Sequence, residues 1–139
     1  MDGNAFKEAR KIISNHLNSV LVTIDDSEQL RDRVMWTAKI DDDLIVYYAA
    51  SLKSPQVKRI KMNPNVLVLW FGNNKYVSLR GFAEIITDKA VLYEIWHESF
   101  KKYFPNGKND PDYVVIKVMP SGLVCVDNCD AAVDVIDLH

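Results

Sequence analysis

Short β-rich segments follow one another along this chain with few residues between them, and this succession constrains the fold more than any other feature. Within the first 50 residues, segments 20–24, 33–40 and 44–50 are rich in β-branched, aromatic or other apolar side chains and are separated by polar residues. Three strands in a row at such short spacing predict an antiparallel meander. Further strands are expected at residues 66–71, 76–87, 113–118 and 123–126, with Pro120-Ser121-Gly122 separating the last two.

Turn-forming residues lie between the expected strands. Asp25-Asp26-Ser27 and the three aspartates at 41–43 suit hairpin tips, and Gly72-Asn73-Asn74 predicts a further hairpin turn. Gly81 interrupts the long strand at 76–87, and a glycine in that position often marks a bulge or a barrel corner. The apolar run at 66–71 predicts a strand that is buried on both faces.

Three segments have helical signals. Residues 6–17 place apolar side chains at helical spacing, which predicts an amphipathic helix. Ser54-Pro55 is a favoured helix start, Asn63-Pro64 ends that helix, and Asp88 begins another that is expected to run to about Tyr103. No linker or repeat divides the chain. The sequence therefore predicts one domain over residues 1–139: a mainly β (α+β) barrel of six or seven antiparallel strands, closed or nearly closed, with helices packed outside.

Charge and composition narrow the class of protein. Seventeen basic against nineteen acidic residues give a net charge of −2, which disfavours nucleic-acid binding as the main role. The longest apolar run has six residues, whereas a membrane helix needs about 20. No apolar segment follows the N-terminal residues as in a secretory signal, and Cys125 and Cys129 cannot make a disulfide framework. We therefore expect a cytosolic protein without a membrane span. The three histidines lie far apart, and no metal site is expected.

The helix start at Ser54 is the best candidate for binding an anion. Free N–H groups at a helix N-terminus suit a phosphate, and Lys53 and Lys58 lie near it in the sequence. Arg33 could add a bidentate contact to the same anion. The alternative is an ordinary basic helix face exposed to solvent. Aromatic residues in the strands could line a pocket for a flat ring or could simply form the core: Trp36, Tyr47, Tyr48, Trp70, Phe71 and Tyr76.

The ordered set of motifs resembles the FMN-binding split-barrel proteins related to pyridoxamine 5′-phosphate oxidase, and within them the general stress protein 26-like branch. The resemblance covers about residues 6–128. Four motifs support the resemblance. The first two are Arg33-Val34-Met35-Trp36, and Ser54-x-x-Val57-Lys58-x-Ile60 running into Asn63-Pro64-x-Val66. The other two are Tyr76-Val77-Ser78-x-x-Gly81-x-Ala83-Glu84, and Trp96 followed by Phe104-Pro105-x-Gly107-x-x-Asp110-Pro111-Asp112.

This resemblance implies a homodimer with FMN, or FAD as the alternative, in clefts at the dimer interface. It also implies a small-molecule electron donor or acceptor as the partner substrate. Arg33 would face the phosphate, and the segment 33–37 would pass along the flavin. Trp96 and the loop 104–112 belong to a segment that often closes the cleft. The residues implied in cofactor binding are Arg33, Val34, Met35, Trp36, Thr37, Ala49, Ala50, Ser54, Gln56, Lys58, Tyr76 and Trp96.

This chain departs from the family pattern at the phosphate. Pro55 and Gln56 stand where the family has an Arg-Lys pair, and Ala50 replaces a hydroxyl side chain; Lys53 or Lys58 could compensate. The C-terminal Arg-x-His that holds the vitamin substrate in true oxidases is also missing, so we do not expect that reaction. No motif places a catalytic acid or base. The leading hypothesis is a flavin-dependent oxidoreductase. The alternatives are a non-catalytic flavin-binding stress protein and a dimeric interaction module that has lost its cofactor.

Overall fold

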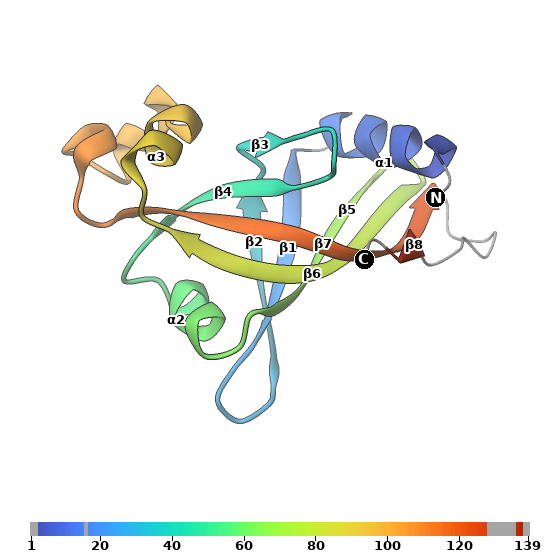
Figure 1. The fold of residues 1–139 in the computed structure, drawn as a ribbon, viewed down its shortest axis with the longest axis horizontal. Coiled ribbons are helices and arrows are strands. Elements are labelled where there is room, and N and C mark those ends of the chain that lie inside the picture. The colour runs from blue at the N-terminus through green and yellow to red at the C-terminus, as the bar shows by residue number, and fades with distance from the viewer. Residues whose placement is uncertain (1–2, 16, 128–135, 138–139) are drawn as a thin grey trace.

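The computed structural model describes residues 3–15, 17–127 and 136–137, and their strands form one antiparallel sheet (Figure 1). The strands are β1 (Asn18–Ile24), β2 (Leu30–Trp36), β3 (Lys39–Ile40), β4 (Val46–Ser51), β5 (Asn65–Gly72), β6 (Lys75–Ile86), β7 (Tyr113–Asp127) and β8 (Ile136–Asp137). Their order in the sheet is β2-β1-β5-β6-β7-β4-β3, and β8 pairs with β7.

The sheet curls back on itself at the connection from β2 to β3. These two strands lie at opposite ends of the sheet, yet only Thr37 and Ala38 separate them in the chain. The chain from Trp36 to Lys39 advances three residues and spans at most about 10 Å even when extended. The two ends of the sheet therefore approach each other. Thr37 N–H donates to the Leu17 carbonyl next to β1, and Ala38 N–H donates to the Tyr47 carbonyl of β4. The predicted antiparallel split barrel with flanking helices is confirmed.

The single strand expected at 33–40 is wrong, because the chain leaves β2 after Trp36 and joins the other end of the sheet as β3. Thr37 turns inward at the break and is buried. Its hydroxyl oxygen accepts a hydrogen bond from the indole N–H of Trp70, at 3.0 Å. A residue 33 positions later in the chain therefore fixes this break, and no local sequence signal indicates it.

The expectation of two strands at 113–118 and 123–126 is also wrong, because β7 runs without interruption. Its register with β6 shifts between Arg80 and Gly81, where the partner residue changes from Gly122 to Pro120. A proline lacks the N–H for a regular ladder and is tolerated at such an irregularity. A Cβ on Gly81 would lie 2.4 Å from the Met119 carbonyl oxygen, so only glycine fits this close approach. The bulge predicted at Gly81 is confirmed.

Strand β5 alternates between the two sides of the sheet, and the expectation that it is buried on both faces is wrong for the single chain. Val66, Val68 and Trp70 point into the barrel, whereas Phe71 on the outer side is 63% exposed. A continuous apolar run does not distinguish a strand buried by its own chain from one whose outer face is uncovered.

Helices cover two ends of the barrel (Figure 1). Helix α1 (Gly3–Asn15) packs Ala9, Ile12 and Ile13 into the core, as the amphipathic pattern predicts. Helix α2 (Pro55–Met62) begins after Ser54 and ends at Asn63. None of the helices in the described ranges has the length and apolar character needed to span a bilayer.

Helix α3 (Lys89–Ile95) is shorter than predicted. Asp88 begins it as expected and accepts a hydrogen bond from Ala90 N–H at 2.9 Å. The chain leaves the helical conformation at Trp96 and His97, and continues as two short 3₁₀ helices, η1 (Glu98–Lys102) and η2 (Gly107–Asn109). The reason is packing: Phe100, Phe104 and Tyr113 form a second apolar cluster with Leu92 and Ile95, which a straight helix could not build.

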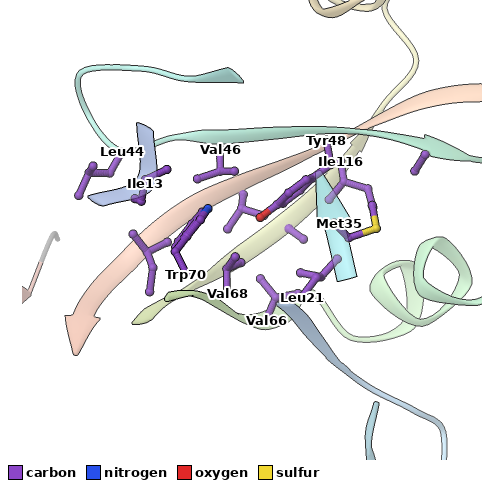
Figure 2. Packing of buried hydrophobic residues seen from close by; sticks show 14 of the residues in the cluster. Ile13, Leu21, Met35, Leu44, Val46, Tyr48, Val66, Val68, Trp70 and Ile116 are labelled. Carbon is purple, nitrogen blue, oxygen red and sulfur yellow. The ribbon is translucent and has the colours of Figure 1, made fainter. Parts of the chain in front are cut away.

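The barrel core is centred on Trp70 and Tyr48, both fully buried (Figure 2). Each of these large side chains satisfies its polar atom inside the core. The Tyr48 hydroxyl shares a hydrogen bond of 2.8 Å with the Ser19 hydroxyl, which in turn donates to the Met35 carbonyl. In the second cluster the Tyr113 hydroxyl donates to the Leu92 carbonyl at 2.8 Å.

These two phenols predict loss of stability at alkaline pH. Burial raises the pKa of Tyr113 to about 12, and burial raises the pKa of Tyr48 further above its usual value. Both tyrosines lose protons more easily in the unfolded chain, near pH 10. Their contribution to the free energy of unfolding is therefore complete below about pH 10 and falls as the pH rises from about 10 toward 12. Urea titrations followed by circular dichroism across this range should show the loss, and Tyr48→Phe with Tyr113→Phe should reduce it. Equal slopes in wild type and double variant would contradict the prediction.

Candidate functional site

A cleft of about 270 Å³ opens where the barrel is split, between the free edge of β2 and the end of β4. The lining residues come from β2, β4, the start of α2 and the segment around η1. They are Arg33, Val34, Met35, Trp36, Ala49, Ala50, Ser51, Ser54, Gln56, Phe100, Tyr103 and Phe104. Small-molecule sites enclose about 300–1,000 Å³. A flavin-sized ligand would therefore fill this cleft and extend beyond it.

The β2 side of the cleft is the end of the sheet. Strand β2 pairs only with β1, so the other edge of its backbone is free along Arg33–Trp36 within the described structure. Arg33 lies opposite Leu21 in the register. Its guanidinium makes no ion pair with a described residue, and the side chain is exposed at the cleft.

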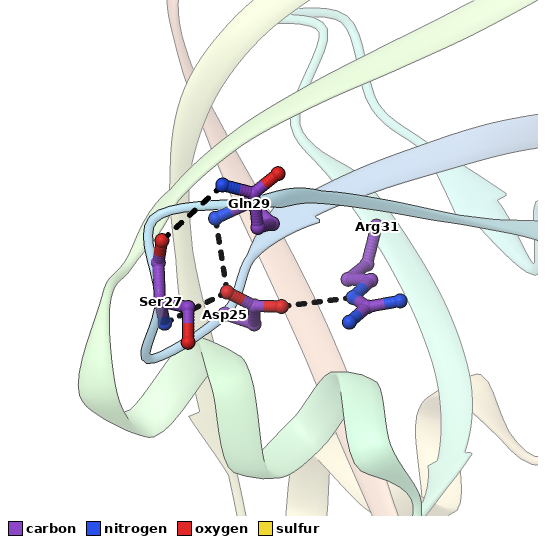
Figure 3. A network of polar contacts seen from close by, with 4 residues as sticks. All are labelled: Asp25, Ser27, Gln29 and Arg31. Carbon is purple, nitrogen blue, oxygen red and sulfur yellow. Dashed lines mark hydrogen bonds and ion pairs between the residues drawn. The ribbon is translucent and has the colours of Figure 1, made fainter.

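The neighbouring arginine on β2 is used elsewhere (Figure 3). At the β1–β2 hairpin, Asp25 accepts hydrogen bonds from Ser27 N–H at 2.8 Å, Gln29 N–H at 2.9 Å and the Arg31 Nε at 2.8 Å. The Gln29 N–H, together with Arg31, holds the pKa of the Asp25 carboxyl below its usual value. Arg31 therefore stabilises the hairpin, and Arg33 remains for a ligand.

The corner between β4 and α2 forms the second wall. Ser51 carbonyl accepts from both the N–H and the hydroxyl of Ser54, at 2.9 and 2.7 Å. Ser54 occupies the helix N-cap position, but its hydroxyl does not cap the helix. Gln56 is only 5% exposed and its amide nitrogen lies 3.8 Å from the sulfur of Met35. This wall therefore brings polar side chains to the cleft.

Aromatic side chains form the third wall. Phe100 and Phe104 are buried with an edge at the cleft, and Tyr103 between them is 69% exposed. The Trp36 ring packs edge-on against Phe100 with centroids 5.9 Å apart. Sequence reasoning missed Ser51, Phe100 and Tyr103 as lining residues, and it named Phe104 only as the start of the loop that often closes the cleft. The spacing of aromatics at 100, 103 and 104 is the one signal in the sequence that indicates a shared face.

Four of the residues expected at the cofactor do not line this cleft. Thr37 points into the core, Lys58 is exposed on α2, and Trp96 packs in the second cluster against Tyr113 with centroids 5.2 Å apart. Tyr76 lies opposite Phe71 at the β5–β6 hairpin, on the outer side of the sheet. Lys53, a candidate to compensate for the missing cations, is 80% exposed and lies 3.5 Å from Asp112.

The cleft has the features that a flavin phosphate requires, although with few cations. Its walls are mostly apolar and aromatic, which suits a flat ring, and Arg33 lines the same cleft as Ser54 and Gln56 at the start of α2. The backbone N–H groups of Gln56 and Val57 lie in the first turn of α2, where no intrahelical acceptor exists for them. Residues that fit the ring and a phosphate are therefore present in one place.

The family model for pyridoxamine 5′-phosphate oxidase-like proteins matches residues 4–125 of this chain. The chain belongs to the pyridoxamine 5′-phosphate oxidase-like family. The resemblance found in the motifs is thus confirmed, while the individual cofactor contacts stay predictions. The C-terminal Arg-x-His of true oxidases is missing from the sequence of residues 134–139. Of these residues the structure describes only the backbone of Ile136 and Asp137, so this difference is known from the sequence alone.

Solved structures of this family share the fold. General stress protein 26 from Bacillus anthracis str. Sterne superposes with a TM-score of 0.82 at 24% identity, over 96% of this chain and 98% of that one. A protein from Clostridium acetobutylicum related to general stress protein 26 gives 0.78 at 20% identity, over 88% of each chain. A pyridoxamine 5′-phosphate oxidase-related, FMN-binding protein from Nostoc punctiforme gives 0.58 at 13% identity, over 86% and 78%. No curated protein matches the chain.

Proposed function

We propose that the protein is a cytosolic homodimeric flavoprotein that binds FMN in the β2–α2 cleft and exchanges electrons with a small molecule. The observation that carries the proposal is the meeting of Arg33, the start of α2 and an aromatic wall in one cleft. Bound flavin would supply the redox chemistry. The chain's own residues would orient the ring between β2 and the aromatic wall, pair with the phosphate and exclude water from the ring.

The absorbance spectrum of the purified protein tests this proposal. We expect flavin absorbance bands that shift when the protein is denatured, and chromatography of the released chromophore separates FMN from FAD. Turnover with a nicotinamide donor and an electron acceptor then distinguishes an oxidoreductase from a flavin-binding protein without catalysis. A colourless protein whose addition leaves FMN fluorescence unchanged would leave the interaction module as the remaining interpretation.

The outer face of the sheet supports the homodimer. Apolar side chains on this face are exposed or half-buried across the three neighbouring strands β2, β1 and β5: Val20, Val22, Ile24, Leu30, Val34, Leu67, Leu69 and Phe71. Exposed apolar surfaces of this extent mark interfaces. Tyr76 lies on the same face, opposite Phe71. A second copy on this face would bring the partner subunit's Tyr76 to the interface, which agrees with a cleft completed by two chains.

Phe71→Asp should therefore convert a dimer into a monomer. Each copy would lose an apolar contact worth about 1.5–3 kcal/mol, and in a two-fold interface the loss counts twice, so dissociation should increase more than about 100-fold. Light scattering should give twice the 15.9 kDa chain mass for wild type and a single chain mass for the variant. Met62→Glu, an exposed apolar position on α2, is the matched control and should remain dimeric. A wild-type monomer at micromolar concentration would contradict the dimer.

A further inference from the structure

Two charged residues lie at opposite ends of one row on the outer face of the sheet. In the register, Asp32 of β2 lies opposite Val22 of β1, and Val22 lies opposite Leu67 of β5. Leu67 in turn lies opposite Arg80 of β6. Residues that lie opposite each other on neighbouring antiparallel strands point to the same side of the sheet. The row therefore has an acid at one end, a base at the other and two apolar side chains between them.

Burial places this row on the outside of the barrel. The neighbours of Val22 and Leu67 along their strands are buried: Leu21, Thr23, Val66 and Val68. Asp32 and Arg80 are exposed, and neither forms an ion pair with another residue in the described part of the chain. A groove of about 230 Å³ is lined by Val22, Leu67 and Arg80 together with other, mostly apolar residues. The base therefore lies at the rim of an apolar surface.

Asp32 and Arg80 cannot neutralise each other within one chain. Neighbouring strands lie about 4.8 Å apart, so three strand spacings separate the two residues by about 14 Å. A partner that covered the apolar surface between them would also take both charges partly out of water, which is costly unless each charge is matched. The face therefore fits a partner that carries a base opposite Asp32 and an acid opposite Arg80.

We infer that this partner is a second copy of the chain, packed face to face about a two-fold axis that runs parallel to the strands between β1 and β5. The inference rests on the homodimer of the proposed function and specifies its arrangement. Such an axis keeps the position along the strands and exchanges the two ends of the row. Asp32 then faces the partner subunit's Arg80, and Arg80 faces the partner subunit's Asp32. One pair of residues thus gives two ion pairs, as a two-fold interface requires.

The two charges distinguish this axis from the alternative. A two-fold axis that crossed the strands would lay β2 against the β2 strand of the second copy, and β6 against its β6. Asp32 could then never meet Arg80, and like charges would face each other if the row lay on the axis, which is destabilising. Aligned sheets pack about 10 Å apart, a gap that the side chains of an arginine and an aspartate can bridge together.

The same axis brings a residue of each chain to the cleft of the other. Trp36, which lines the cleft, lies two residues beyond Val34 on β2. On β5, Phe71 lies two residues beyond Leu69, and Tyr76 of β6 lies opposite Phe71. Because Val34 and Leu69 both lie opposite Val20, Trp36 and Tyr76 lie at the same level of the sheet. Exchange of the two sides therefore places Tyr76 against the partner subunit's Trp36, beside the cleft.

Charge reversal tests the arrangement, with the dimer dissociation constant measured by analytical ultracentrifugation of the full chain. Asp32→Arg and Arg80→Asp should each raise this constant at least about 100-fold, because each change creates two like-charge contacts. Combining Asp32→Arg with Arg80→Asp in one chain restores both pairs, so the constant should return to within about fivefold of wild type. An equal mixture of the two single variants should also form dimers, since every arginine of the row would then face an aspartate.

Two further reversals are the matched controls. Asp26→Arg at the β1–β2 hairpin and Lys61→Asp on α2 make similar changes in net charge at exposed positions outside the row, and both variants should remain dimeric. Circular dichroism checks that every variant is folded. Single variants of the row that dimerise like wild type, or a combined variant as weak as the single ones, overturn the inference and leave the homodimer intact. A monomeric wild type overturns both, whereas flavin absorbance tests the cleft separately.

Discussion

In the Arg33→Ala protein, FMN binding is expected to weaken about thirty- to over a hundredfold, which corresponds to about 2–3 kcal/mol. Arg33 is the cation that lines the cleft, and its guanidinium can give two parallel N–H donors to one phosphate. Riboflavin lacks the phosphate and should lose almost nothing. Arg33→Lys should recover part of the affinity, because an ammonium supplies the charge but not the paired donors.

Arg31→Ala is the matched control for this measurement. Arg31 lies on the same strand two residues earlier, and its guanidinium is bound to Asp25 at the hairpin. Fluorescence-quenching titrations of the three variants with both ligands provide the comparison. Equal losses for FMN and riboflavin in Arg33→Ala would mean that Arg33 supports the ring or the fold. An FMN affinity unchanged in Arg33→Ala would place the phosphate elsewhere.

The Trp70→Ala substitution should lower the free energy of unfolding by about 3–5 kcal/mol, the range for removing a buried aromatic ring. The ring is 0% exposed in the centre of the barrel, and its N–H satisfies the buried hydroxyl of Thr37 at the break between β2 and β3. The substitution would leave a cavity and would remove the indole donor from the buried Thr37 hydroxyl. We therefore expect the substitution also to loosen the β2–β3 connection, which brings the two ends of the sheet together. Because domains of this size are stable by only about 5–15 kcal/mol, the variant should be close to unfolded at 37 °C.

Trp36→Ala separates core packing from the cleft. Trp36 is 42% exposed, so its removal should cost less than about 1.5 kcal/mol while weakening flavin binding. Urea denaturation at one protein concentration, followed by circular dichroism, gives the free energies of unfolding of the Trp70→Ala and Trp36→Ala variants. Trp70→Phe is the milder companion if the alanine variant does not fold: it keeps most of the ring but loses the hydrogen bond to Thr37. Unfolding midpoints for Trp70→Ala equal to wild type would contradict the assigned role.

Features that depend on near neighbours in the chain could be predicted from the sequence. The polar turn at Asp25 and the helix starts at Ser54-Pro55 and Asp88 are set by side chains and backbone within a few residues. The amphipathic period of α1 identifies its buried face, and Gly81 identifies the bulge in β6. The ordered motifs gave the family, and several predicted cofactor residues lie together in the cleft. Their contacts with a cofactor stay predictions.

Features that depend on residues distant in the chain required the tertiary structure. The break after Trp36 needs the indole of Trp70, and the unbroken course of β7 through Pro120 needs Gly81 opposite it. The exposure of Phe71 depends on which face of the sheet the chain itself covers. Tyr103 reaches the cleft because the second apolar cluster ends α3 at Ile95. The sequence determined local conformation, which short-range sterics and hydrogen bonds specify. Only the tertiary structure decided which polar atoms meet at Arg33, because packing between distant segments brings them together.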